Sequence, residues 1–347
     1  MQLNRFTRGL RCSCLVLLFG FATACAAPEN RPPAMPAPVV PPPAPVVVQA
    51  PPAPPPVVLS AAIDEKAVAD ATGVATIETS SDGVVKASFP RKDIDVTIDG
   101  WKVPPFLGLT SWVAFTPAQK GVADAMMMGD LVLFEDEVNP VLSALLEFHV
   151  QVTALHNHFF YDAPHVYFMH VGGEGTVATL GGGVRVAINT ISKIRMQNQK
   201  LARGWGAPPL LAKNAIDGGK LEAIFGVKGQ AKEGMFKVTM GRSVAASCGC
   251  NIGKTMGVNT WAAFAGNDEN AVVDGDFAVG ERELQPVLKA LRAGGINIVA
   301  IHQHMSGENP RILFLHYWGR GKAAELAATL KTALDLTAWD NPKPELT

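Results

Sequence analysis

Residues 154–170 read ALHNHFFYDAPHVYFMH, and residues 300–316 read AIHQHMSGENPRILFLH. Each segment has an apolar run that leads into His-x-His, a polar turn with Asp-x-Pro or Glu-x-Pro, and a second apolar run that ends in histidine. Apolar runs on either side of such a turn are typical of two strands joined as a hairpin. Six of the eight histidines occupy equivalent positions in the two segments. The sequence therefore predicts a duplicated hairpin in which the unusual side chains are concentrated.

The similarity between the two halves extends beyond this hairpin. Residues 64–73 match residues 217–226, each with an acidic helix start, a short amphipathic run and a final glycine. Residues 129–142 match residues 275–288, and both indicate a strand that leads into a helix with proline near its start. Each half is thus expected to contain a helix, strands, a second helix, the hairpin and a closing helix. This order predicts an α+β fold, built as a tandem pseudo-symmetric repeat in which each copy is a largely antiparallel sheet with helices packed on it.

Five segments follow from composition and from the repeat. We expect the two copies to form one body or two closely docked domains, and the linker to pack along the surface. The predicted segments are an export signal at 1–24, a proline-rich tether at 25–59, the first copy at 60–191, a linker at 192–215 and the second copy at 216–340.

The N-terminal segment has three arginines, an apolar run at 15–21 and small residues before Cys25. This apolar run is too short for a helix that spans a membrane, and it is typical of an export signal. Cleavage before Cys25 is expected either at an Ala-x-Ala site or at a lipoprotein site that leaves Cys25 lipid-modified, and we favour the lipoprotein. The Pro/Ala/Val-rich residues that follow are typical of an extended spacer. We therefore expect a membrane-anchored protein that faces the periplasm or the cell exterior.

Charge and cysteine content limit the function classes. The chain has 30 basic and 31 acidic residues and no basic run, so a nucleic-acid partner is not expected. Motifs of nucleophilic hydrolases, of nucleotide-binding loops and of dinucleotide-binding folds are absent from the sequence. Cys248-Gly-Cys250 suits a local disulfide and two unpaired thiols equally well in an oxidising compartment.

A family resemblance rests on several motifs of the first half. These are Ser-Trp-x-Ala-Phe at 111–115, Gly-Asp-x-x-Leu at 129–133, Glu-x-Glu-Val-Asn-Pro-Val-Leu at 135–142 and Ala-Leu-His-Asn-His at 154–158. Together they resemble the LppY/LpqO family of proposed bacterial lipoproteins, over about residues 60–340. The match is looser in the second half, where Gln303 replaces Asn157. The resemblance implies export and lipid anchoring, and it supplies no catalytic residues.

The His-x-His pairs are the candidate functional residues. Alternate residues of a strand point to the same face, so each pair presents two neighbouring imidazoles. Two imidazoles with a third histidine or a carboxylate suit zinc or copper, whereas histidines of a partly buried sheet can also be purely structural. We weigh these two interpretations equally. The candidate ligands are His156, His158 and His170 with Asp162 as a further choice in the first copy, and His302, His304 and His316 with Glu308 in the second.

Two function classes remain. The absence of a catalytic motif favours a ligand- or metal-binding accessory protein of the cell envelope, with an envelope component as its partner. The alternative is a metal-dependent hydrolase that acts on an envelope substrate, with Glu135 or Glu281 as its base. Both glutamates also stand where carboxylates stabilise a helix start, which is their ordinary structural role.

Overall fold

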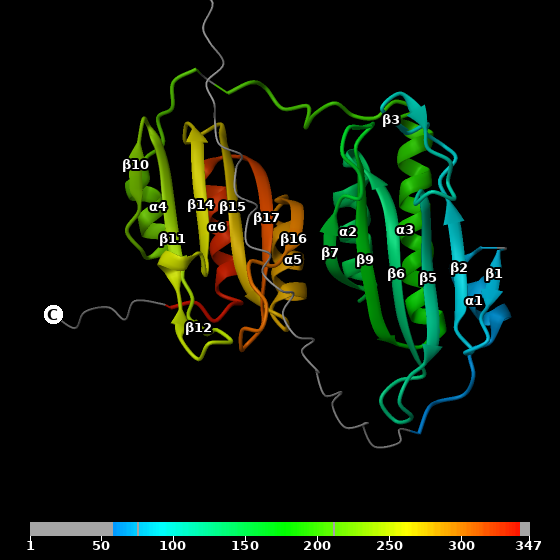
Figure 1. Ribbon diagram of the computed structural model, residues 1–347. Helices are drawn as coiled ribbons and strands as arrows, with labels where there is room; N and C mark the ends of the chain where they lie inside the picture. Colours follow the sequence, from blue (N-terminus) through cyan, green and yellow to red (C-terminus); the bar gives the residue numbers. More distant parts are fainter. Residues whose placement is uncertain (1–57, 75, 211, 341–347) are drawn as a thin grey trace, which may run out of the picture. The chain divides into compact units, whose positions relative to one another are not determined.

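The computed structural model describes residues 58–74, 76–210 and 212–340, and Figure 1 shows their course. The described residues belong to one compact unit. The predicted export signal, Cys25 and nearly all of the predicted tether lie outside the described residues. Within the described part, no helix combines the length and apolarity needed to cross a membrane.

The two copies contain the same series of main elements, although within the described residues β8 (Asp162–Ala163) occurs only in the first copy and the 3-10 helix only in the second. The first copy contains α1 (Glu65–Thr72), β1 (Ile77–Thr79), β2 (Val85–Pro90), β3 (Thr97–Ile98), β4 (Trp101–Lys102), β5 (Thr110–Pro117), β6 (Ala125–Phe134), α2 (Glu135–Glu147), β7 (Gln151–His156), β8 (Asp162–Ala163), β9 (Val166–Gly175) and α3 (Val177–Gln197). The second copy contains α4 (Gly218–Phe225), β10 (Gln230–Lys232), β11 (Met235–Gly241), β12 (Val244–Ala245), β13 (Asn251–Ile252), the 3-10 helix η1 (Lys254–Met256), β14 (Asn259–Gly266), β15 (Ala271–Gly280), α5 (Leu284–Ala293), β16 (Asn297–His302), β17 (Ile312–Gly321) and α6 (Ala323–Leu334).

One 12-stranded sheet contains the main strands of both copies, in the order β1-β2-β5-β6-β9-β7-β16-β17-β15-β14-β11-β10. The ladders within each copy are antiparallel, as in the pairs β6–β9 and β15–β17. The copies meet at β7 and β16, where Leu155 lies opposite Ile301. The prediction of an α+β tandem repeat with antiparallel sheets is therefore confirmed.

Local sequence signals explain the first helix of each copy. The Asp64 side chain accepts hydrogen bonds from the first turn of α1, and Asp217 does the same for α4. Both helices end at a glycine in the left-handed region, Gly73 with φ 73° and Gly226 with φ 72°. The matched residues 64–73 and 217–226 are thus equivalent helices with equivalent caps.

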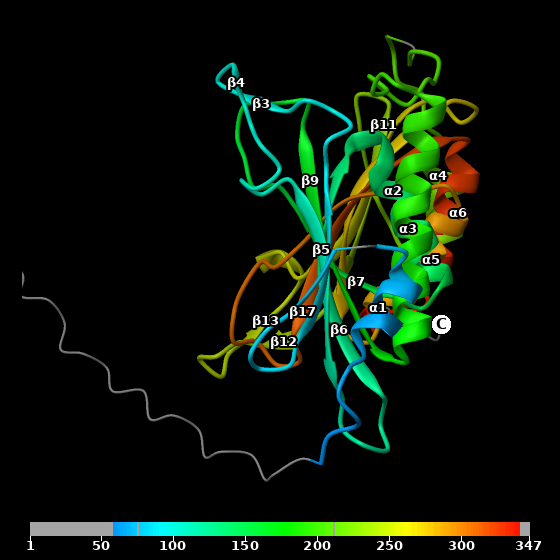
Figure 2. The ribbon, with the colours of Figure 1, turned by 90° about the vertical axis from the view of Figure 1, so that its right-hand side faces the viewer.

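The two faces of the sheet are covered differently. Figure 2 shows the helices on one side of the strands and the β3–β4 and β12–β13 segments on the other. In β6, Leu131 and Leu133 pack in the large core that includes α2, whereas Val132 and Phe134 face the opposite way. There they pack with residues of the 94–109 segment in a smaller cluster. The second face is therefore only partly covered, and this is the face on which the histidines lie.

Reciprocal hydrogen bonds join the copies beside the β7–β16 pair. The strand register shifts next to Val152 in β7 and next to Ile298 in β16. Asn139 of α2 donates to the Ile298 carbonyl over 3.1 Å and accepts from its N–H over 2.7 Å. Gln285 of α5 donates to the Val152 carbonyl over 2.8 Å and accepts from its N–H over 3.1 Å. Buried backbone N–H and carbonyl groups need hydrogen-bond partners. At each register shift, a side chain of the other copy supplies them.

The closing helix of the first copy differs from its predicted position. The sequence places the end of the first copy, and with it the closing helix, at residue 191, but α3 runs from Val177 to Gln197. The Thr176 side chain accepts from Thr179 N over 3.1 Å and fixes the helix start. In the last turn, Arg195 pairs with acids at the start of α2. These contacts keep residues 192–197, which the sequence assigns to the linker, within the helix.

The cysteines that allowed two interpretations form a disulfide, Cys248–Cys250. It lies between β12 and β13, which pair as a short antiparallel hairpin. The β12–β13 hairpin is also attached to the β16–β17 turn, because Ala245 and Asn309 exchange backbone hydrogen bonds of 3.2 and 2.9 Å. The disulfide-closed loop thus stands beside the segment that carries the second His-x-His pair.

Candidate metal centre

Three neighbouring strands of the second copy bring its acidic and imidazole groups together. Asp276 of β15 lies opposite His316 of β17, and Ala300 of β16 lies opposite His316 on the other side. His302 ends β16, and His304 follows it in the loop. The strand order β16-β17-β15 therefore places these side chains in a row across one face of the sheet.

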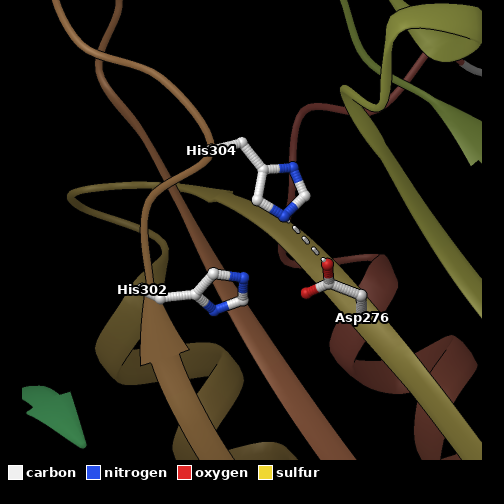
Figure 3. Close-up of side chains that lie close together, drawn as sticks. All are labelled: Asp276, His302 and His304. Atoms are coloured by element: carbon white, nitrogen blue, oxygen red, sulfur yellow. Dashed lines mark ion pairs between the residues drawn. The ribbon is translucent and has the colours of Figure 1, made fainter. Parts of the chain in front are cut away.

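Asp276, His302 and His304 converge on one point, as Figure 3 shows. One carboxylate oxygen and two imidazole nitrogens all lie within 4.8 Å of one another. The His304 Nε2 atom is 3.5 Å from Asp276 Oδ2. In the described part of the chain this is the one group of at least three such ligand atoms that converges. These three side chains can hold a metal ion.

Aromatic packing fixes the imidazole rings. The ring of His304 stacks on Phe314 at 3.5 Å between centroids, and that of His302 stacks on His316 at 4.8 Å. His316 Nδ1 lies 3.2 Å from the Gly275 carbonyl oxygen, and His316 is not part of the converging group. His316 thus packs against the ring of the candidate ligand His302 and limits its orientation by stacking.

The electrostatics of the centre favour a bound cation. Asp276 is 2% exposed, and its Oδ1 has no hydrogen-bond partner within the described residues. Burial raises the pKa of the Asp276 carboxyl to about 6. Burial also lowers the pKa of His302 and of His304, which favours the neutral imidazoles that metals require. A cation at the centre would supply the missing partner of the carboxylate, so the donor set fits a metal ion.

The first copy repeats the composition of this centre with another geometry. Its His156 Nε2 and His158 Nε2 atoms are 3.2 Å apart, and the ring of His156 stacks on His170 at 4.8 Å. Burial raises the pKa of Asp130, whose Oδ1 has no partner among the residues that the structure describes. The carboxylate and both imidazoles do not converge here as they do in the second copy. The stacking nevertheless places His170 on the same face as His156, so each copy assembles its own cluster.

The acids predicted from the hairpin turns, Asp162 and Glu308, are not at the candidate metal centre. Asp162 Oδ2 accepts from Val166 N over 2.7 Å, and Glu308 Oε1 accepts from Ile312 N over 3.0 Å. Each carboxylate therefore holds the start of the second hairpin strand. Neither belongs to the converging group.

The glutamates considered as bases also lie outside the converging group. Glu135 is exposed at the start of α2, and exposed Glu281 is 3.9 Å from Arg311 Nε. The helix starts are held by their neighbours instead, since Glu137 accepts from Phe134 N over 3.0 Å and Glu283 accepts from Gly280 N over 2.7 Å.

The carboxylates that sequence reasoning missed are Asp130 and Asp276. A signal for them exists, because both follow glycine in the duplicated Gly-Asp of residues 129–130 and 275–276. The hairpin pattern predicts an acid within the hairpin, close to the histidines in sequence. The acid comes instead from the strand that pairs with the second hairpin strand, and only the register of that pairing places it beside the histidines.

Comparisons with known proteins support the duplication and assign a family. Among solved structures, the chain is similar to a trimeric bacterial microcompartment shell protein, PduB, at 13% identity over 75% of this chain and 89% of that chain, with a TM-score of 0.16. A likeness at this score carries no argument about fold or function. No curated protein matches the chain. A family model matches residues 66–190 and 219–336, which are the two copies. The chain therefore belongs to the family described as Domain of Unknown Function (DUF1259).

Proposed function

We propose that this protein binds a divalent transition metal through Asp276, His302 and His304. The convergence of their ligand atoms within 4.8 Å, at a buried carboxylate whose Oδ1 lacks a hydrogen-bond partner among the described residues, carries this proposal. Two imidazoles and a carboxylate are ligands that suit zinc and copper. The equivalent Asp130, His156 and His158 of the first copy are proposed as a further site of the same composition. Their side chains must move before the ligand atoms converge.

Binding is favoured over catalysis by the position of the candidate bases. A metal-dependent hydrolase needs an open coordination position next to a general base. Three protein ligands leave such a position, but Glu135 and Glu281 are outside the converging group. We therefore propose a metal-binding accessory protein of the cell envelope, whose ligand is an envelope component.

Elemental analysis of protein purified without chelator or affinity metal tests the metal site. We expect the His302→Ala/His304→Ala variant to contain about one zinc or copper ion per chain less than the parent. The His156→Ala/His158→Ala variant is expected to keep that ion. His165→Ala is a matched control, because this histidine belongs to neither cluster and its side chain is 64% exposed. Equal metal in the parent and in the His302→Ala/His304→Ala variant would contradict the proposal.

Export and lipid anchoring at Cys25 are also proposed, with a location that faces the periplasm or the cell exterior. The arginine-containing and apolar N-terminus and the resemblance to the LppY/LpqO family support them. Mass spectrometry of the mature N-terminus is expected to give a lipid-modified Cys25. An unmodified terminus, or one at another residue, would refute the anchor and leave the metal site untouched.

A further inference from the structure

A cavity of about 440 Å³ lies away from the histidines, beneath the segment that links the copies. Its walls come from the start of α2, from β9, from the end of α5, from β16 and from residues 202–205 of the linker. The volume is within the range of small-molecule sites, and apolar walls with a few polar groups are typical of them. Its lining includes the polar and aromatic groups of Glu135, Tyr167, Trp205, Arg292 and Asn297.

The linker makes this cavity different from its pseudo-symmetric counterpart. The shift of 146 that relates the hairpins also relates Val299 of this cavity to Thr153, which lines a second hollow at the start of α5. No linker residue lines that second hollow. The same shift relates Arg292 to Leu146. The linker residues and the Arg292 guanidinium of this cavity thus have no equivalent in the second hollow.

Arg292 presents a fixed guanidinium to the cavity. Its Nε donates to Ser143 Oγ over 3.0 Å, and its Nη1 donates to the Ile296 carbonyl over 2.9 Å and to Asn297 Oδ1 over 2.7 Å. Its Nη2 has no hydrogen-bond partner in the ranges that the structure describes, and no carboxylate there forms an ion pair with the group. Burial lowers the pKa of Arg292, which shows that its charge is poorly solvated. A rigid guanidinium with free N–H donors is suited to a carboxylate.

Another part of the wall has the opposite character. Glu135 is an exposed carboxylate. Burial, together with the negative charge of Glu135, raises the pKa of the Tyr167 hydroxyl. These oxygens can accept hydrogen bonds from an ammonium or a hydroxyl group. The indole of Trp205 and the side chains of Val138 and Val299 supply apolar surface in the same cavity.

We propose that this cavity binds a small organic acid that carries an ammonium or hydroxyl group, as an amino acid or the end of a short peptide does. The carboxylate meets Arg292, the donor group meets Glu135, and the body of the ligand packs on Trp205. This site does not use the metal centre, so its occupant is expected to bind in the presence of a chelator.

Isothermal titration with chelator present tests the site. The probes are phenylalanine and alanyl-alanine, each compared with its carboxamide, which keeps the ammonium and removes the negative charge. We expect at least one acid to bind. The affinity of its amide is expected to be lower by about 10-fold or more, because the charge-assisted hydrogen bonds to Arg292 are lost. Binding of neither acid, or equal binding of acid and amide, would overturn the proposal.

A matched pair of variants locates the binding. Val299 is 44% exposed on β16, so Val299→Trp is expected to fill the cavity without disturbing the core and to abolish binding. Thr153→Trp places the same bulk at the equivalent position of β7 and is expected to leave binding unchanged. Binding that survives Val299→Trp, or that both variants reduce equally, would refute this location. Metal content measured on the same proteins keeps this result separate from the metal proposal.

Discussion

Replacement of Asp276 by asparagine is expected to lower the metal affinity of the second copy by on the order of 100-fold or more. The amide removes the one negative charge among the three converging ligands, and the loss of groups that merely support a ligand already costs about 10- to 100-fold. Competition titration against a chromophoric chelator measures this change. The exposed Asp274→Asn, two residues away on β15, is the control and is expected to keep the parent affinity.

The same substitution is expected to stabilise the metal-free protein at neutral pH. Burial raises the pKa of the Asp276 carboxyl from 3.8 to about 6, so the native state binds this proton more tightly than the unfolded state does. The contribution of this group to the free energy of unfolding is therefore largest below the unfolded pKa, and it falls as the pH rises from 3.8 to about 6. Above that range the buried carboxylate costs about 3 kcal/mol, a cost that asparagine avoids.

Urea unfolding in the presence of chelator separates the two pH regimes. The free energy of unfolding of Asp276→Asn is expected to exceed that of the parent by up to about 3 kcal/mol near pH 7.5, and the difference is expected to vanish near pH 4. A variant that is less stable than the parent at both pH values would show that the carboxylate has a structural role. Stability sacrificed for a site is a common feature of functional residues.

Replacement of Glu137 by alanine is expected to lower the free energy of unfolding by about 3–5 kcal/mol. The Glu137 side chain is fully buried, and its carboxylate is 2.8 Å from Arg91 Nη1 and 3.0 Å from Arg195 Nε. It also accepts from Phe134 N at the start of α2. Its removal leaves two buried guanidinium groups without their shared anion and an unpaired backbone donor. Urea unfolding of the variant and the parent measures this cost.

The second copy supplies the matched control. Glu283 holds the equivalent place beside α5 and pairs with Arg242, but its side chain is 18% exposed and it has one arginine partner among the described residues. Glu283→Ala is therefore expected to cost about 1–2 kcal/mol, since water can reach the groups left behind. An equal cost for the two substitutions would show that burial of the first network contributes nothing beyond the helix cap.

The duplication could be predicted because it is written in local patterns. Capping acids at Asp64 and Asp217, and glycines at Gly73 and Gly226, begin and end helices through contacts within a few residues. The hairpins follow from apolar runs around a polar turn. The end of α3 is harder to predict from the sequence, because the residue that holds its last turn, Arg195, pairs with acids of another helix.

The candidate centre could be predicted only in part. His302 and His304 share a face because alternate residues of an extended segment do so, whatever the rest of the fold. Asp276 is added by the pairing of β15 with β17, since a slip of one residue would turn it to the helix-covered face. No pattern within either segment fixes that register.

The amino-acid sequence is thus sufficient for the repeat, the hairpins and the histidine pairs, because each depends on interactions between residues close together in the chain. The three-dimensional structure is needed for the carboxylate of the metal centre, for the reciprocal bonds of Asn139 and Gln285, and for the cavity beneath the linker. Each of these joins residues far apart in the chain. Their geometry depends on strand register and on the packing of one copy against the other, which nearby residues do not encode.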